Sequence, residues 1–235
     1  MDNARRQRLL QLSAGGVFLA IIVVVVVIIV VSSGSGDKGG EPSKSEQGEV
    51  GKLLTGIPQS GMTLGKPDAP VKVLEYGDLQ CPYCKANAEE VTPEVIEHQV
   101  RNGEASITFR NFVIIGPDSV PAGEAALAAG AQGKAWNFIE LFYRNQGEEN
   151  SGYVTEEFIE SIGKSAAIPD LAKWNKERKS GKYKKQLEAT TKQAEKIGFS
   201  GTPSFAIEGP KSKGPEQIHS PETSGQLEEE IEKAS

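Results

Sequence analysis

The motif Cys81-Pro82-Tyr83-Cys84 constrains this chain more than any other feature, because it contains the only two cysteines in the sequence. Residues 71–76 are rich in β-branched and aromatic side chains and predict a strand, while residues 85–101 predict a helix. The motif therefore lies where a strand ends and a helix begins. Unpaired backbone N–H groups and the positive end of the helix dipole stabilise a thiolate at such a position. The sequence thus predicts a cysteine pair that makes and breaks one disulfide.

Three other interpretations of the two cysteines are open but less favoured. A zinc site would need two further ligands, and the only histidines, His98 and His219, are far apart in the sequence and form no ligand pair. We therefore expect no metal. A purely structural disulfide would close so short a loop that it would stabilise the fold only weakly. Inert buried thiols would suit an apolar site better than one next to Lys85 and Asn87.

An uninterrupted apolar segment, residues 14–31, is long enough to span a bilayer of roughly 30 Å as a helix. Arg5, Arg6 and Arg8 precede it, and no basic residue directly follows it, so the positive-inside rule places residues 1–13 in the cytoplasm. A cleaved signal peptide is the alternative, although its apolar stretch is usually only ~7–15 residues long. We expect a single-pass anchor in the cell membrane, with the rest of the chain extracytoplasmic.

Composition divides the remainder of the chain into a linker and one domain. Residues 32–60 are rich in Gly, Ser, Lys and Glu, and they predict a flexible linker that spans on the order of 25–30 Å. Residues 61–235 have the usual size of one domain with one core. The net charge of −6 and the lack of a basic cluster in this domain argue against a nucleic-acid partner.

The predicted elements of the domain alternate unevenly, which indicates the α/β class. The strand 71–76, the helix 81–101 with a kink at Pro93, and the strand 106–112 form a βαβ unit with parallel strands. Five helices follow, at 122–131, 135–144, 156–165, 170–179 and 182–197, and then two strands, at 204–208 and 216–219, and a last helix, at 226–233. A helical block, residues 118–197, is thus inserted into a small sheet. Its aromatic residues are expected in the core: Trp136, Phe138, Phe142 and Trp174.

The motif Cys81-Pro82-Tyr83-Cys84, the helical insertion and the segment Gly201-Thr202-Pro203 resemble the DsbA-like thiol:disulfide oxidoreductases of the thioredoxin superfamily. Glutaredoxins share the tetrapeptide, but more than a hundred positions separate Cys81 from Pro203, far more than in a compact glutaredoxin. The resemblance covers the chain from about Met62 onward. It implies a thioredoxin-like fold with an inserted helical domain, here preceded by a single N-terminal transmembrane helix, and no cofactor.

The resemblance also implies roles for particular residues. Cys81 would be the exposed nucleophile, and Cys84 the buried partner that resolves the mixed disulfide. Pro203 would be a cis-proline facing the pair, with Thr202 offering backbone groups to a substrate segment. Glu75 would be a buried acid that moves a proton to and from the inner thiol. The alternatives are an ordinary trans turn at Pro203 and an exposed edge-strand glutamate at Glu75.

The two residues between the cysteines, Pro82 and Tyr83, are counted with the site. The periplasmic oxidase of the family has a histidine at the third motif position, where it adds positive charge beside the thiolate, and Tyr83 has no such charge. Because a stabilised thiolate makes a strong oxidant, this departure predicts a weaker one.

The function we predict is that of a membrane-tethered, extracytoplasmic oxidoreductase. It would introduce disulfides into exported proteins that carry cysteine pairs, through a mixed disulfide on Cys81, and would need a quinone-linked membrane partner for its own reoxidation. A reductase or isomerase of the same fold is one alternative. A redox-inert tethered binding or chaperone module is the other.

Overall fold

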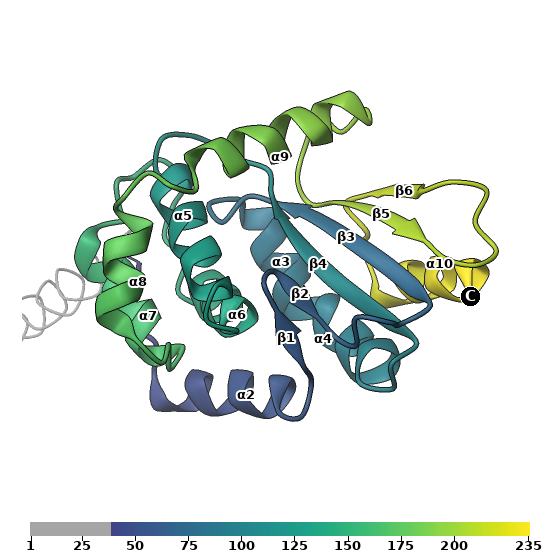
Figure 1. Ribbon diagram of the computed structural model, residues 1–235, viewed down its shortest axis with the longest axis horizontal. Helices are drawn as coiled ribbons and strands as arrows, with labels where there is room; N and C mark the ends of the chain where they lie inside the picture. Colours follow the sequence, from purple (N-terminus) through teal and green to yellow (C-terminus); the bar gives the residue numbers. More distant parts are fainter. Residues whose placement is uncertain (1–38) are drawn as a thin grey trace, which may run out of the picture. The chain divides into compact units, whose positions relative to one another are not determined.

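In the computed structural model, which describes residues 39–235, six strands form one sheet in the order β1-β2-β4-β3-β5-β6 (Figure 1). The central strand β3 pairs in parallel with β4 and antiparallel with β5. The strands are β1 (Gln59–Ser60), β2 (Thr63–Leu64), β3 (Val71–Gly77), β4 (Ala105–Asn111), β5 (Ser204–Glu208) and β6 (Glu216–His219). The parallel pair is the one that the βαβ pattern predicts, because a helix connects its two strands.

The connection between β3 and β4 is a broken helix. It consists of α3 (Pro82–Glu90), α4 (Thr92–Val95) and a π-helical turn, η1 (Ile96–Val100), and the first break falls at Val91. Pro93 has no N–H to donate and its ring clashes with the preceding turn, so an uninterrupted α-helix is disfavoured there. The predicted kink in this helix is confirmed.

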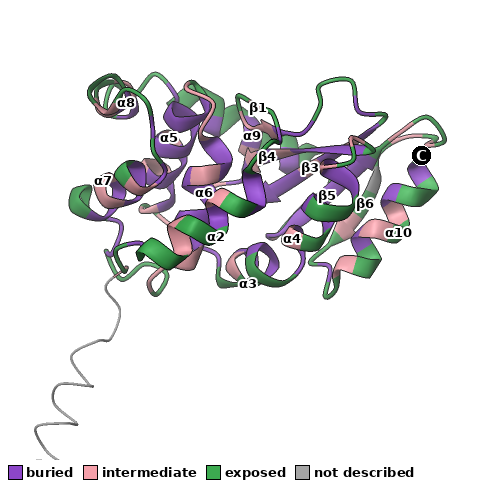
Figure 2. Cartoon of the chain, turned by 90° about the horizontal axis from the view of Figure 1, so that it is seen from below, coloured by how far each residue is buried: buried purple, intermediate pink, exposed green. Residues whose placement is uncertain are grey.

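The inserted helices are α5 (Ser119–Gly130), α6 (Ala135–Arg144), α7 (Glu156–Ser165), α8 (Leu171–Arg178) and α9 (Lys184–Lys196). In Figure 1 the inserted helices α5 to α8 lie at one end of the sheet, α9 runs along the top from α5 over β4, and β6 lies with α10 (Ser224–Ala234) at the other end. The four predicted core aromatics are fully buried, and the rings of Phe138 and Trp174 lie 5.9 Å apart. Figure 2 shows the central strands β3, β4 and β5 mostly buried and the outer faces of the helices exposed.

The predicted flexible linker, residues 32–60, is wrong over its C-terminal part, because residues 44–54 form the helix α2 (Lys44–Leu54). Ser43 and Glu46 form a capping box at its start. Val50, Leu53 and Leu54, spaced as one face of a helix, are buried, and α2 contacts α6. The backbone N–H of Gly40 also donates to the carbonyl oxygen of Asn145, so the domain includes residues well before the predicted start at 61.

The strands β1 and β2 were not expected from the sequence, because each is only two residues long and shows no alternating pattern. Among residues 39–235, no helix combines the length and the apolar character that a membrane span requires. The predicted anchor, residues 14–31, lies outside the described residues.

Candidate active site

The cysteine motif lies at the junction of β3 and α3, as the sequence predicts. Cys81 is the N-cap residue of α3, with φ −74° and ψ 121°. Pro82 begins the helix, and its missing N–H costs no hydrogen bond there because the first N–H groups of a helix have no partner within the helix. The Cys81 carbonyl accepts the backbone N–H of Lys85, which closes the first turn. Cys84 lies one turn inside, and both cysteines are free thiols, so the structure represents the reduced state.

Both thiols are covered, which corrects the prediction of an exposed Cys81. The exposed fraction of Cys81 is 3%, and that of Cys84 is 0%. The two residues between the cysteines, Pro82 and Tyr83, are exposed, and the exposed fraction of Tyr83 is 72%. Cys81 is covered because the loop before β5 lies against it: its Sγ donates to the carbonyl oxygen of Thr202, at 3.3 Å.

The peptide bond between Thr202 and Pro203 is cis. Pro203 immediately precedes β5, and β5 pairs with β3 so that Ser204 lies opposite Tyr76. This register brings the Thr202–Pro203 loop to the end of β3 from which the motif emerges. The strand pairing, rather than sequence proximity, is what places Thr202 beside Cys81.

The two thiols differ strongly in acidity. The pKa of Cys81 is lowered to about 6, first by a hydrogen bond from the Cys84 side chain and further by the Thr202 side chain and by backbone N–H groups of the motif, while burial opposes this shift. Burial raises the pKa of Cys84 well above its usual value, and the hydrogen bond and charge of Cys81 raise it further. Cys81 is therefore much the more acidic thiol of the pair, and when it ionises it gives up its hydrogen bond to the Thr202 carbonyl.

Glu75 lies within β3, with an exposed fraction of only 2%. Burial raises its pKa to about 8, and the charge of Glu140 adds to this increase. The charge of Glu75 in turn contributes to the raised pKa of Cys84. Glu75 is therefore a buried acid in electrostatic contact with the inner thiol, and the alternative of an exposed edge-strand glutamate is wrong.

Asp78 and Gln146 hold the motif loop in place, and the sequence analysis missed both. Asp78 Oδ1 accepts the N–H of Gln80 at 2.9 Å, and its Oδ2 accepts the N–H groups of Ile114 and Ile115, each at 2.9 Å. The available signal was an aspartate directly after a strand, where its carboxylate can bind loop N–H groups.

Gln146 approaches the motif from the segment just after α6, within the helical insertion. Its Nε2 donates to the carbonyl oxygens of Leu79, at 2.7 Å, and of Cys81, at 3.2 Å. Nothing in the local sequence marks Gln146, because the contact joins residues 65 positions apart. The helical insertion thus fixes the backbone of the nucleophile.

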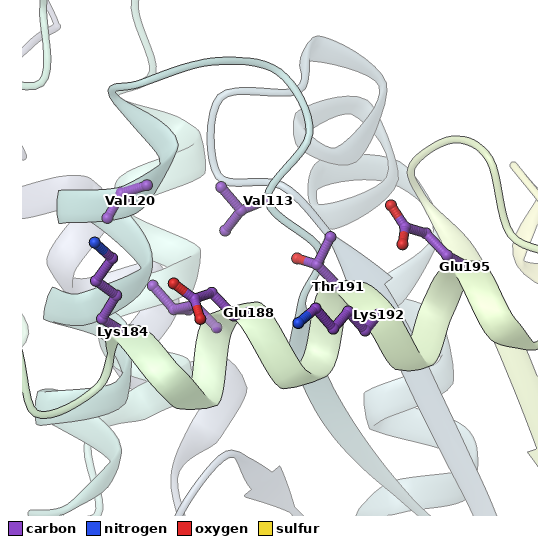
Figure 3. Close-up of a pocket in the computed structure, with 8 residues that line it drawn as sticks. Val113, Val120, Lys184, Glu188, Thr191, Lys192 and Glu195 are labelled. Atoms are coloured by element: carbon purple, nitrogen blue, oxygen red, sulfur yellow. The ribbon is translucent and has the colours of Figure 1, made fainter.

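Two pockets of the domain are relevant here, one lined by a motif residue and one lined by none. A groove of about 360 Å³ is lined by Tyr83, Asn87, Pro203 and Pro221, among others, and runs between α3 and the cis-proline loop. A second pocket, of about 300 Å³, lies between α9, α5 and the segment after β4 (Figure 3). Its lining includes Val113, Leu187 and charged side chains of α9, but no motif residue. Among residues 39–235, no cluster of three His, Cys, Asp or Glu side chains fits a metal ion.

Comparison with known proteins agrees with this geometry. Residues 58–232 match the family model described as Thioredoxin. The chain belongs to the thioredoxin family. It is also 34% identical to a probable disulfide bond formation protein D of Bacillus cereus, over 63% of this chain and 69% of that relative.

Solved structures show the same fold. The oxidised crystal structure of BdbD from Bacillus subtilis superposes with a TM-score of 0.66 at 22% identity, covering 85% of this chain and 98% of that one. That of α-DsbA1 from Wolbachia pipientis gives a TM-score of 0.62 at 19% identity, covering 77% and 92%. The chain is thus a DsbA-like thiol:disulfide oxidoreductase with a helical insertion in a thioredoxin-like fold. The predictions of its family and its enzyme class are confirmed.

Proposed function

We propose that this oxidoreductase introduces disulfides into exported proteins that carry cysteine pairs, and that it does so while tethered to the extracytoplasmic face of the cell membrane. The observation that carries the direction of the reaction is the contrast between the two thiols. A thiolate stabilised on Cys81 favours the reduced enzyme, and a dithiol with a stabilised reduced form is an oxidant. The name of the Bacillus cereus relative supports the same direction.

The reaction begins with the oxidised enzyme, in which Cys81 and Cys84 form a disulfide. A substrate thiolate attacks the sulfur of Cys81, and the bond to Cys84 breaks with its electron pair on the Cys84 sulfur, which takes up a proton. A second substrate thiolate then attacks the substrate sulfur of the mixed disulfide and releases the Cys81 thiolate. The substrate dithiol loses two electrons and the enzyme gains two. Attack at Cys81 is favoured because the sulfur of Cys84 is fully buried.

Glu75 is proposed as the acid that supplies the proton to Cys84. Its pKa of about 8 leaves it protonated at neutral pH, and the pKa of Cys84 is higher still, so transfer to a departing Cys84 thiolate is downhill. When the disulfide forms again, the same carboxylate takes the proton back. A carboxyl at this position therefore serves both directions of exchange.

The substrate segment is proposed to lie in the groove between Tyr83 and Pro203. The groove is lined by Tyr83 of the motif and by Pro203. Thr202, the residue before Pro203, accepts a hydrogen bond from the Cys81 thiol through its carbonyl oxygen. An extended peptide beside the cis-proline loop would place its cysteine next to Cys81. The exposed ring of Tyr83 offers apolar contact, so we expect broad recognition of unfolded segments.

The membrane tether rests on the apolar run 14–31 and on the arginines before it. In the sequence, only residues 32–38 separate the predicted anchor from Gly39, the first residue that the structure describes. Fully extended, they span at most ~25 Å. The domain would therefore work close to the bilayer, within reach of the quinone-linked membrane partner that we propose for its reoxidation.

A reductase or isomerase is the second candidate, and Tyr83 is the observation that favours it, because this residue brings no positive charge to the thiolate. Incubating the oxidised enzyme with a reduced, unfolded protein distinguishes the two. Oxidase function predicts that about one substrate disulfide forms per enzyme disulfide consumed. If the reduced enzyme instead reduces substrate disulfides and the oxidised enzyme forms none, the proposed direction is wrong.

A further inference from the structure

A second buried carboxyl group, that of Glu140, lies in the insertion helix α6 and takes no part in the mechanism described above. The exposed fraction of Glu140 is 1%, and neither of its carboxylate oxygens has a hydrogen-bond partner among the described residues. Burying a carboxylate without hydrogen-bond partners costs free energy, so its presence in the core suggests a function that offsets this cost. The position of Glu140 relative to Glu75 supplies one.

Strand and helix geometry place the two acids on facing surfaces. A Cβ on Gly77 would lie 3.1 Å from the hydroxyl oxygen of Tyr143, so the face of β3 that carries Gly77 is turned toward α6. Glu75, two positions earlier, lies on that same face. Glu140 precedes Tyr143 by three positions and lies one turn away on the same side of α6. Phe109, the partner of Glu75 across the strands, also contacts the Tyr143 ring, with the ring centroids 6.4 Å apart.

The one cation beside Glu140 is shared, so it neutralises Glu140 only partly. Arg144 Nη2 lies 3.8 Å from Glu140 Oε2, beyond hydrogen-bonding distance, and Arg144 Nη1 lies 3.4 Å from Oε2 of the exposed Glu49 in α2. The other charged groups that face Glu140 are acids, Glu75 of β3 and Glu89 of α3. Burial raises the pKa of Glu140 to about 7, with Arg144 lowering it and Glu89 raising it.

We propose that Glu140 is a positioning residue for thiol–disulfide exchange. Its buried carboxylate makes no hydrogen bond within residues 39–235 and lies on the side of α6 that faces β3, as Glu75 lies on the side of β3 that faces α6. Repulsion between the two carboxylates keeps the proton on Glu75 until Cys84 takes it. When the Cys81–Cys84 bond breaks, the proton moves from the Glu75 carboxyl to the Cys84 sulfur and leaves a carboxylate. Repulsion from Glu140 then favours uptake of a proton from solvent by Glu75, which restores the acid. Glu140 contacts neither the substrate nor a sulfur atom.

This inference rests on the proposed role of Glu75, so the test follows Glu75 directly. The carboxylic C=O stretching band of Glu75 is titrated by infrared spectroscopy on the reduced enzyme, and it is identified by its loss in Glu75→Gln. In Glu140→Gln the midpoint of this titration should fall by about one pH unit, because the like charge is removed. Glu140→Asp keeps the charge, so its midpoint should stay close to that of the wild-type enzyme. Glu157→Gln, which removes an exposed carboxylate from the first turn of α7, is the control and should leave the midpoint unchanged.

The second measurement is the pH profile of the reaction of the oxidised enzyme with dithiothreitol, corrected for the thiolate fraction of the reagent. Glu140→Gln should shift the alkaline limb to lower pH by the same amount, which slows the reaction roughly fivefold at pH 8. If Glu140→Gln does not fold, Glu140→Met removes the charge at similar side-chain length. An unchanged Glu75 midpoint in either folded variant would overturn the inference about Glu140.

The outcomes separate the two proposals. If the infrared midpoint shifts in Glu140→Gln but Glu75→Gln retains the wild-type pH profile, Glu140 acts on Glu75 as inferred, and the proposed role of Glu75 in exchange is wrong. If Glu75→Gln loses the alkaline limb while Glu140→Gln leaves both readouts unchanged, Glu75 keeps its role and the inference about Glu140 fails.

Discussion

The Cys81 sulfur lies 3.3 Å from the carbonyl oxygen of Thr202, although the two residues are 121 positions apart in the chain. This contact joins the N-terminus of α3 to the loop before β5, across the whole helical insertion. It places the nucleophile beside the backbone that a substrate segment would follow. The contact therefore brings the nucleophile and the backbone of the cis-proline loop together at one point of the fold.

The first prediction concerns the acidity of Cys81. The ultraviolet absorbance of the thiolate in the reduced protein should titrate with a midpoint near pH 6, because hydrogen bonds from Cys84 and Thr202 stabilise the charged sulfur. Cys84→Ser should keep most of this transition, since serine also donates a hydrogen bond. Cys81→Ser should abolish it. A midpoint above about pH 8, the ordinary range of a cysteine, would show that the site does not activate Cys81.

The second prediction tests which cysteine attacks. Cys84→Ser should accumulate covalent complexes with exported proteins that a reductant dissolves, because the mixed disulfide on Cys81 has lost its resolving thiol. Cys81→Ser should accumulate almost none, since the sulfur of Cys84 is fully buried. Non-reducing gels of acid-quenched cells, followed by mass spectrometry, measure both. The reverse pattern would exchange the two roles.

The third prediction concerns stability and Glu75. Its folded-state pKa of about 8 lies above the usual value of 4.5, so the carboxyl favours the folded state fully below pH 4.5, and this contribution is lost as the pH rises toward 8. Glu75→Gln has no such loss. Its free energy of unfolding relative to wild type should therefore increase between pH 4.5 and 8, by ~1.4 kcal/mol per unit of pKa difference. Denaturant unfolding at a series of pH values measures the change, and a pH-independent difference would contradict a buried, titrating Glu75.

The fourth prediction concerns Gln146. Its replacement by alanine removes two hydrogen bonds to the carbonyls of Leu79 and Cys81, so the variant should lose about 1–2 kcal/mol of stability and react more slowly at Cys81. Gln132→Ala is the matched control, because its amide donates to the carbonyl of Asp170 away from the motif. Equal effects on reactivity in both variants would mean that Gln146 has no particular role at the site.

Much of the fold was predictable because its elements carry strong local patterns. The helices α6 and α7 and the strands β5 and β6 have the predicted bounds, and the break at Pro93 follows from the chemistry of one residue. The helix α2 was missed although Ser43 and Glu46 form a capping box and Val50, Leu53 and Leu54 have helical spacing, because the composition of the segment indicated a linker.

The site was predictable only where a motif or a resemblance marked it. Cys81, Cys84 and Pro203 stand in recognisable patterns. The burial of Cys81 was not predictable, because it depends on the Thr202 loop, which strand pairing brings to the motif. Gln146 was not predictable either, because it contacts the motif from the segment after α6. Likewise, only tertiary packing shows that Glu140, an acid in the amphipathic helix α6, faces the core.

The reduction potential of the Cys81–Cys84 pair tests the proposed oxidase function most directly, because it combines the stabilities of the thiolate and the disulfide in one number. Equilibrating the protein with glutathione buffers at pH 7 and quantifying free thiols gives this potential. The contrast between an acidic Cys81 and a weakly acidic Cys84 predicts a value between about −200 and −120 mV, in the range of oxidants and isomerases. A potential near about −270 mV, as in thioredoxin, would show a reductant and contradict the proposed direction.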